Sequence, residues 1–228
     1  MKKTAFFAAV PVAAAAFAMA GALAFAEPES MDDGAQVVIT GKDKKAVSDK
    51  SDKATMTAKI GEAAPDFTLM DQDGNPVTLS DYKGKIVVIE QFNDQCPYVQ
   101  KFYKNGDMNR LADEAGDDVV WLAIDSSDFS SVEENKEIAG EWKIDRPLLD
   151  DSSGEVGKMY KSKTTPHMRV IDADGILRYD GAIDDNRSAN PDDIASANNY
   201  VMAAIEAVRN GETVEPAETK PYGCGVKF

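Results

Sequence analysis

The chain has 228 residues, with 25 Lys and Arg against 40 Asp and Glu, and a formal net charge of −15 at pH 7. This acidic balance argues against nucleic-acid binding, which needs a basic footprint. Because the chain holds two Cys and one His, a Cys₄ or His₃ zinc site cannot be built, and we expect neither a metal nor a cofactor. Its partners are expected to be small molecules or other proteins.

The first residues have the pattern of an export signal. Lys2 and Lys3 precede an uncharged run over 4–26 that ends in Ala-Phe-Ala. A positive start, an apolar run and a small-residue site predict a signal peptide over 1–26, cleaved after Ala26. An uncleaved membrane anchor is the alternative, since the run approaches the length that spans a bilayer. The sequence thus predicts a periplasmic or secreted protein, with no membrane span after cleavage, in a compartment where disulfides form.

The rest of the chain divides into a leader, one domain and a tail. Residues 27–58 are polar and nearly free of large apolar side chains, which predicts a flexible leader. Hydrophobic periodicity begins at Lys59, and residues 59–215 are long enough for one domain with a single core. Residues 216–228 form a C-terminal tail that carries Cys224.

The first half of the domain predicts a hairpin and then a strand–helix–strand unit. Strands are expected at 67–70 and 77–79 around an Asp-Gly turn, and buried β-branched runs predict strands at 86–92 and 119–124. Between those two strands a helix should start at Pro97, falter at Asn105-Gly106 and restart with Asp107 as its cap.

The second half predicts more helix and a second hairpin. Expected elements are a helix from the capping box Ser131-x-x-Glu134 to about Ala139, a short helix at 156–160, hairpin strands at 168–172 and 177–180, and a closing helix that Asn190 caps and Pro191 opens. Together these elements predict an α/β fold with a mixed central sheet, helices on both faces and an N-terminal β-hairpin.

Several motifs in this order resemble the redoxin or AhpC/TSA family of the thioredoxin-fold superfamily. They are Ala64-Pro65-Asp66-Phe67, Leu79-Ser80-Asp81, Gly84-Lys85, the strand-Cys-helix junction at Cys96, Thr165-Pro166 and Asp174-Gly175. The resemblance implies a thioredoxin fold, a nucleophilic cysteine and thiol redox chemistry. The stretch Cys96-Pro97-Tyr98-Val99 looks like that of a bacterial exported subgroup that lacks the Cys-x-x-C motif.

Cys96 is the predicted nucleophile. It lies where a buried strand passes into a helix, with Pro97 at a position that suits the first helical turn. A thiol at a helix N-terminus faces unpaired N–H groups and the positive end of the helix dipole, and both stabilise the thiolate. The alternative is an inert, buried cysteine.

Glu90 is the predicted proton relay. It lies six residues before Cys96, within a run of Val and Ile, where desolvation raises the pKa of a carboxyl group and suits it to exchange a proton near neutral pH. In the thioredoxins that the chain resembles, an acid at this spacing lies beneath the sulfur and relays protons. The alternative is that Glu90 lies at a sheet edge or pairs with a Lys.

The resemblance also implies a substrate-binding set formed by Pro97, Thr165, Pro166 and His167. Thioredoxin folds place a cis proline opposite the catalytic cysteine, and the Thr165–Pro166 bond matches it. The residue before such a proline can pair with an extended substrate segment. His167 is a candidate modulator of the thiolate, although strand alternation can point it away.

The second cysteine decides the mechanism. Val99 stands where a dithiol oxidoreductase has its second Cys, so a resolving thiol must be Cys224 or come from outside. Glycines on both sides of Cys224 would let the tail reach Cys96. A purely structural Cys96–Cys224 disulfide is the alternative, and closing so long a loop would stabilise the fold by about 4 to 5 kcal/mol.

The leading hypothesis is an exported thiol-disulfide oxidoreductase, with a disulfide- or thiol-bearing protein or small molecule as substrate and an external reductant. A thiol peroxidase is the first alternative, but Ile89 and Asn93 replace the Pro and Thr of the peroxidatic signature. A non-catalytic binding protein is the second, either a scaffold with a structural disulfide or a copper carrier using Cys96, His167 and Met168.

Overall fold

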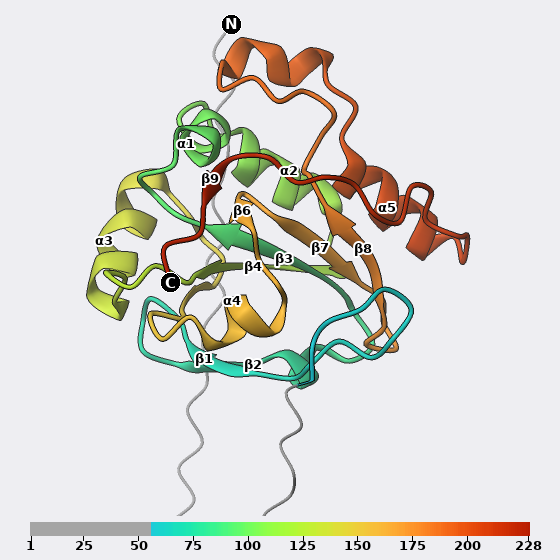
Figure 1. Cartoon of the computed structure of the whole chain (residues 1–228), viewed down its shortest axis with the longest axis horizontal. Helices are drawn as coiled ribbons and strands as arrows, with labels where there is room; N and C mark the ends of the chain where they lie inside the picture. Colours follow the sequence, from blue (N-terminus) through green and yellow to red (C-terminus); the bar gives the residue numbers. More distant parts are fainter. Residues whose placement is uncertain (1–55) are drawn as a thin grey trace, which may run out of the picture. The chain divides into compact units, whose positions relative to one another are not determined.

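A computed structural model describes residues 56–228 of the chain (Figure 1). The predicted signal peptide over 1–26 and nearly all of the predicted leader over 27–58 lie outside the described residues. Within the described range, no helix is both long and apolar enough to cross a membrane.

The centre of the fold is a mixed sheet of seven strands. Its order is β2-β1-β5-β4-β3-β7-β8, in which β3, β4 and β5 run parallel and the other pairs are antiparallel. The strands are β1 (Thr68–Met70), β2 (Pro76–Thr78), β3 (Ile86–Phe92), β4 (Val119–Asp125), β5 (Leu148–Asp150), β7 (Met168–Ile171) and β8 (Leu177–Gly181). This is the predicted mixed α/β sheet with an N-terminal hairpin.

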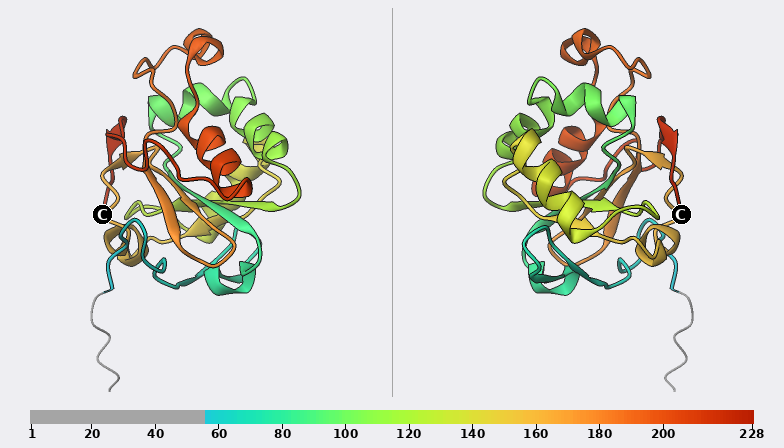
Figure 2. Two further views of the ribbon diagram at one scale, coloured as in Figure 1. Left: turned by 90° about the vertical axis from the view of Figure 1, so that its right-hand side faces the viewer. Right: turned by 90° about the vertical axis from the view of Figure 1, so that its left-hand side faces the viewer.

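Helices cover both faces of the sheet. They are α1 (Pro97–Tyr103), α2 (Asp107–Ala115), α3 (Val132–Trp142), α4 (Glu155–Met159) and α5 (Tyr200–Arg209), with two 3₁₀ helices, η1 (Leu79–Tyr82) and η2 (Pro191–Ser196). Side chains of α1, α2, α3 and α5 pack with Val88 and Phe92 in one core, whereas η1 and α4 pack with Val87 and Ile89 in the other. Figure 2 shows α1, α2 and α5 together on one side of the strands. Strand alternation in β3 thus separates the two cores.

Local signals in the sequence account for most of these elements. The buried run Ile86–Phe92 forms β3 with the predicted bounds. Ser131 caps α3, because its side chain accepts a hydrogen bond from the Glu134 backbone N–H. Gly74 adopts a positive φ of 80° in the first hairpin turn, a conformation that glycine tolerates without strain.

Two helix predictions are wrong in detail. The cap of α2 is Gly106, in the left-handed conformation, and Asp107 is the first helical residue. The closing helix is divided: Asn190 caps the short η2, and a second cap, Asn199, accepts from the Met202 backbone N–H and starts α5. A second Asx cap interrupts the helix because its side chain replaces backbone partners.

Three short strands were not predicted. They are β5, β6 (Thr164–Thr165) and β9 (Cys224–Gly225). The strand β5 pairs with β4 and β1, and β6 pairs with β9 in a separate two-stranded sheet. Such short runs carry too little periodicity to be recognised when no turn signal joins them to a neighbouring strand, as the Asp-Gly turn joins β1 to β2.

Candidate functional site

The site is centred on Cys96, the N-cap residue of α1 (Pro97–Tyr103). Pro97 occupies the first turn of the helix, as predicted, because its fixed φ suits a position that needs no N–H donor. The Cys96 side chain is only 1% exposed, and its Sγ donates a hydrogen bond to the Thr165 carbonyl oxygen at 2.9 Å. The predicted nucleophile therefore lies covered at the carboxyl end of β3.

Cys224 reaches Cys96 through strand pairing. β9 runs antiparallel to β6, with Cys224 opposite Thr165 in the register (Figure 1). Gly223, with φ of 138°, lies so close to Thr165 that a Cβ there would overlap the Thr165 carbonyl oxygen. Both cysteines are free thiols, so the structure represents the reduced pair held side by side.

The two thiols differ in acidity. Burial raises the pKa of Cys96, but hydrogen bonds with Thr165, with Cys224 and with the Val99 backbone outweigh it, so the net effect is a lowered pKa. Burial, together with the hydrogen bond to Cys96 and its charge, raises the pKa of Cys224 to about 11. Cys96 is therefore the better thiolate, and Cys224 holds its proton.

A buried ion pair anchors the tail just before Cys224. The Tyr222 hydroxyl donates to Asp184 Oδ1 at 2.5 Å, and Lys101 Nζ lies 3.9 Å from Asp184 Oδ2. Lys101, on α1, is fully buried and donates to the Ser188 carbonyl oxygen at 2.8 Å. Tyr98 packs edge-on against the Tyr222 ring. The helix that carries Cys96 thus also holds the tail that carries Cys224.

The end of the tail is seated as well. The Lys227 carbonyl oxygen accepts a hydrogen bond from the Asp128 backbone N–H. The Phe228 ring packs where Gly154 and Gly157 leave room, since a Cβ on either glycine would overlap it, and Lys158 Nζ lies 5.1 Å from the ring centroid. The tail is therefore held on both sides of Cys224.

Glu90 lies in a closed polar cluster inside the core. Its carboxylate accepts hydrogen bonds from the Tyr103 hydroxyl at 3.0 Å and from Trp121 Nε1 at 3.0 Å, and Arg146 Nη2 lies 3.8 Å away. Burial raises the pKa of Glu90, although Arg146, Trp121 and Tyr103 each oppose the rise. Glu90 is on the central strand β3, so the sheet-edge alternative is wrong, and its ionic partner is an Arg rather than a Lys. Tyr103 connects the cluster to α1.

The Thr165–Pro166 peptide bond is cis, as the resemblance implied. His167 is buried, and both of its ring nitrogens are engaged. Nε2 lies 2.8 Å from Asp180 Oδ1, and Nδ1 lies 3.0 Å from Arg169 Nη2. Burial, together with the charge of Arg169, lowers the pKa of His167 to about 4. His167 is thus a neutral residue that is bound to Arg169 on β7 and Asp180 on β8. Neither of its ring nitrogens is free to bind a copper ion with Cys96 and Met168.

Asn93, at the place of the peroxidatic Thr, makes its side-chain hydrogen bonds with residues other than Cys96. Its Nδ2 donates to Ser127 Oγ at 2.6 Å, and its Oδ1 accepts from the Gln95 backbone N–H. The Asn93 side chain therefore stabilises the loop before Cys96. In the peroxidatic signature, a hydroxyl group at this position would be available to the sulfur.

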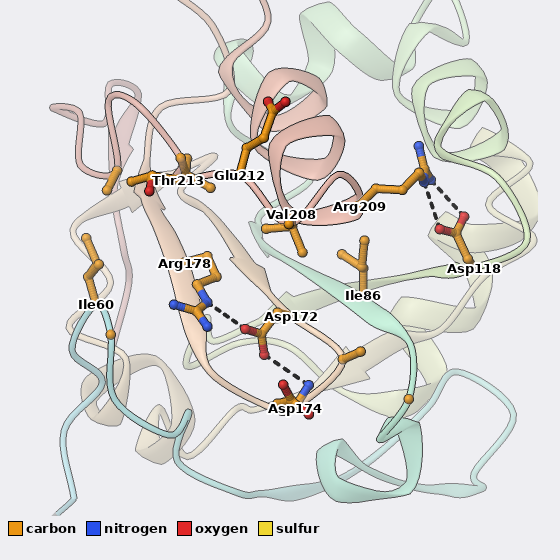
Figure 3. A pocket seen from close by; sticks show the side chains of 16 residues that line it. Ile60, Ile86, Asp118, Asp172, Asp174, Arg178, Val208, Arg209, Glu212 and Thr213 are labelled. Atoms are coloured by element: carbon orange, nitrogen blue, oxygen red, sulfur yellow. Dashed lines mark hydrogen bonds and ion pairs between the residues drawn. The ribbon is translucent and has the colours of Figure 1, made fainter.

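Another cavity lies away from both cysteines. It has a volume of about 590 Å³ and is lined by residues such as Ile86, Asp118, Arg178 and Arg209 (Figure 3). Ile86 begins β3, whereas Cys96 follows the other end of that strand. Arg209 and Arg178 point toward the carboxylates of Asp118 and Asp172, with which they pair. Both arginines of this cavity thus already have carboxylate partners.

Sequence reasoning did not identify three residues that hold the tail, Lys101, Asp184 and Tyr222. One signal was available. Lys101 lies between Val99 and Phe102, on the apolar face of the helix, and a lysine buried there requires an anionic partner.

A sheet of this order with a cysteine at the N-terminus of α1, a cis proline opposite it and a buried acid on β3 defines a thioredoxin-fold protein with one helix-capping thiol. The chain belongs to the Redoxin family, whose profile matches residues 59–201.

Named relatives fall into two groups. The "Thiol-disulfide oxidoreductase ResA" of Bacillus cereus is 27% identical over 124 residues, which cover 51% of this chain and 66% of that protein. The chloroplastic "Peroxiredoxin Q" of Sedum lineare is 36% identical over 110 residues, covering 46% of this chain and 56% of that protein. The chain thus spans less than two thirds of the length of these relatives.

Solved structures agree on the fold. An "uncharacterized conserved protein" from Geobacillus kaustophilus superposes with a TM-score of 0.64 at 30% identity, covering 75% of this chain and 92% of that one. "Peroxidoxin BcpB" from Mycobacterium tuberculosis superposes with a TM-score of 0.51 at 23% identity, covering 67% and 99%. The second likeness concerns the fold alone.

Proposed function

We propose that the chain is an exported thiol-disulfide oxidoreductase in which Cys96 is the nucleophile and Cys224 the resolving thiol. The observation that carries the proposal is the β6–β9 pairing, which holds a thiol with a raised pKa against a thiol with a lowered pKa. The name of the ResA relative supports disulfide exchange. The export signal predicted over 1–26 supports a compartment where such exchange is useful.

The proposed reaction has two exchange steps. The Cys96 thiolate attacks one sulfur of a substrate disulfide, so that a Cys96–substrate disulfide forms and the other substrate sulfur leaves as a thiolate. Cys224 then loses its proton and attacks Cys96 Sγ, which releases the substrate as a second thiolate. The substrate disulfide is reduced, the Cys96–Cys224 pair is oxidised, and an external dithiol reduces that pair again.

Glu90 and the cis-proline loop have supporting roles in this proposal. Glu90 exchanges protons with the site through the Tyr103 hydroxyl, which donates to it and lies on the Cys96 helix. Thr165 and Pro166, with Pro97, border the sulfur and receive the substrate segment. The tail strand β9 pairs with Thr165 in the reduced state, so a substrate segment would have to displace it.

The proposal is tested by disulfide exchange with bis(2-hydroxyethyl) disulfide. With dithiothreitol as the external dithiol, wild type should turn over, and Cys96→Ser should reduce the rate to the background. Without the dithiol, Cys224→Ser should react once and accumulate a mixed disulfide on Cys96 that mass spectrometry detects. Equal rates for wild type and both variants would contradict the proposal.

A second candidate is a thiol peroxidase, favoured by the relatives named peroxiredoxin and by the lowered Cys96 pKa. The Cys96 thiolate would attack the peroxide oxygen, release the alcohol or water and become a sulfenic acid, which Cys224 would convert to a disulfide with loss of water. The hydrogen bond that Asn93 Nδ2 donates to Ser127 opposes this candidate, because it engages the side chain at the place of the peroxidatic Thr. Stopped-flow peroxide consumption no faster than that of a free thiol would eliminate it.

A further inference from the structure

A second cavity, which we call the acidic pocket, borders the Cys96 loop. It has a volume of about 210 Å³, and the lining side chains that matter here are Asp94, Asp125, Phe129, Glu134, Asn135 and Glu137. Asp94 and Gln95, which also lines the pocket, immediately precede Cys96 in the chain. Two residues span at most about 7 Å, so the Asp94 backbone lies within that distance of the Cys96 backbone.

The charge of the acidic pocket is uncompensated. Four carboxylates line it, those of Asp94, Asp125, Glu134 and Glu137, and no Lys, Arg or His of residues 56–228 lines it with them. None of the ion pairs in this part of the chain involves any of the four. Burial, followed by the charges of Asp94 and Asp150, raises the pKa of Asp125 to about 7. Such crowding favours any cation that enters.

An independent observation points to a ligand. Asn135, on α3, lines the acidic pocket and is only 1% exposed, yet neither its Oδ1 nor its Nδ2 has a hydrogen-bond partner among the described residues. Leaving a buried amide unpaired costs free energy, because the group loses its hydrogen bonds to water and gains none in the protein. Its carbonyl oxygen can accept from an N–H cation, and its NH₂ can donate to a polar group beside that cation.

The walls favour an organic cation over a metal ion. No group of three or more His, Cys, Asp or Glu side chains in the described chain is arranged to hold a metal. Phe129 and Ile138 both line the acidic pocket, and Phe129 is 40% exposed. An aromatic face and an alkyl wall suit the stem and the charge of an alkylammonium or guanidinium group.

We propose that the acidic pocket is a specificity subsite that binds an ammonium or guanidinium group next to the disulfide which Cys96 attacks. The inference rests on the proposed function, because it names the substrate class of the same site: cationic disulfides. Asp94 and Glu134 contact the cation, and the Asn135 side-chain oxygen accepts a hydrogen bond from one of its N–H groups.

Three symmetric disulfides of similar size test the inference: cystamine, a dication, bis(2-hydroxyethyl) disulfide, which is neutral, and 3,3′-dithiodipropionate, a dianion. The rate at which each forms a mixed disulfide with Cys96 is measured in the Cys224→Ser protein at fixed ionic strength. The rates are divided by those of 2-mercaptoethanol, which removes the intrinsic reactivity of each disulfide. Cystamine should be preferred over the neutral disulfide by about tenfold or more, as for a charge-assisted contact.

Asp94→Asn and Glu134→Gln should each lower this preference by at least about threefold. Glu206→Gln removes the same charge from an exposed position on α5 and should leave the preference unchanged. Equal normalised rates for cystamine and the neutral disulfide, or equal losses in all three variants, would overturn the inference while the proposed function stands.

A binding measurement separates the subsite from the chemistry. Hexane-1,6-diamine, which carries the charges of cystamine without its disulfide, should bind the Cys96→Ser protein in calorimetry, and Asp94→Asn should weaken that binding by at least about threefold. If Cys96 reacts with none of the three disulfides, the proposed function fails and the inferred substrate class fails with it. Calcium uptake that Asp94→Asn abolishes, without diamine binding, would also overturn the inference.

Discussion

Thr165 contacts both cysteines: its carbonyl oxygen accepts a hydrogen bond from Cys96 Sγ, and its backbone pairs in register with Cys224. One residue therefore sets the position of the nucleophile and of the second thiol. Because β6 and β9 contain two residues each, this pairing depends on the anchors that flank it. Substitutions of those anchoring residues should alter the chemistry of Cys96 although they make no contact with its side chain.

Gly223→Ala should displace β9. The φ of 138° and the closeness of Thr165 leave no room for a Cβ, so Cys224 should lose its register. We expect Cys96–Cys224 disulfide formation from a preformed Cys96 mixed disulfide to slow by about tenfold or more, as an effective concentration is lost. Gly225→Ala is the matched control, since nothing lies within 4 Å of a Cβ there. Quenched mass spectrometry measures both rates, and equal slowing would contradict this account.

Lys101→Met should destabilise the fold and free the tail. It removes one partner of a buried pair and leaves Asp184 uncompensated, which costs about 3 to 5 kcal/mol when the remaining charge stays buried. Burial already raises the pKa of Asp184, so protonation should reduce the loss at low pH. Urea unfolding measures the free energy, with Lys104→Met at an exposed position as control. Adding Asp184→Asn should recover part of the stability, and no recovery would argue against the pair.

Glu90→Gln tests the proton relay. If Glu90 moves protons during resolution, the variant should slow the Cys224 step by about a hundredfold, the size of general acid–base effects, and should flatten its pH profile. Attack by Cys96 on a small disulfide at high pH should change little. Trp121→Phe is the control, because it removes a hydrogen bond to the same carboxylate while keeping the acid. A uniform loss in both steps at every pH would indicate a purely structural Glu90.

His167 should make stability rise with pH. Its pKa in the folded protein is about 4 against the ordinary histidine value of 6.5, so between these values the unfolded chain binds the extra proton. Stability contributed by the neutral imidazole is lost as pH falls from 6.5 to 4, by roughly 3 kcal/mol. His167→Gln should remove this slope in urea unfolding measured across that range. An unchanged slope would show that His167 titrates normally.

Asp125 should act in the opposite direction. Burial raises its pKa from 3.8 to about 7, so the folded protein holds the extra proton between these values. Its contribution is present below pH 3.8 and is lost as pH rises to 7, by roughly 4 kcal/mol. Asp125→Asn should therefore steepen the rise with pH that His167 causes. A double variant with both changes should show the flattest profile, and additive slopes would confirm that the two groups titrate independently.

The strand–turn–helix signals around Cys96 were readable in the sequence. A β-branched run predicts β3, and a Cys-Pro junction predicts a capped helix, because each depends on the conformation of neighbouring residues. For the same reason the Asp-Gly turns and the Ser131 cap were predicted. The division between η2 and α5 could not be predicted from the local sequence. Asn199 starts a new helix there because the Tyr200 backbone N–H donates to the Ile183 carbonyl oxygen, a partner that is distant in the chain.

The order of residues alone shows that one thiol caps a helix and that no second thiol lies within reach in the same turn. The position of Cys224, the pairing of Arg146 with Glu90 and the neutral state of His167 follow only from the folded chain. These relationships join residues far apart in the chain through strand pairing and burial. Neither leaves a local pattern, because the free energy of a long-range contact depends on the whole fold that brings its two sides together.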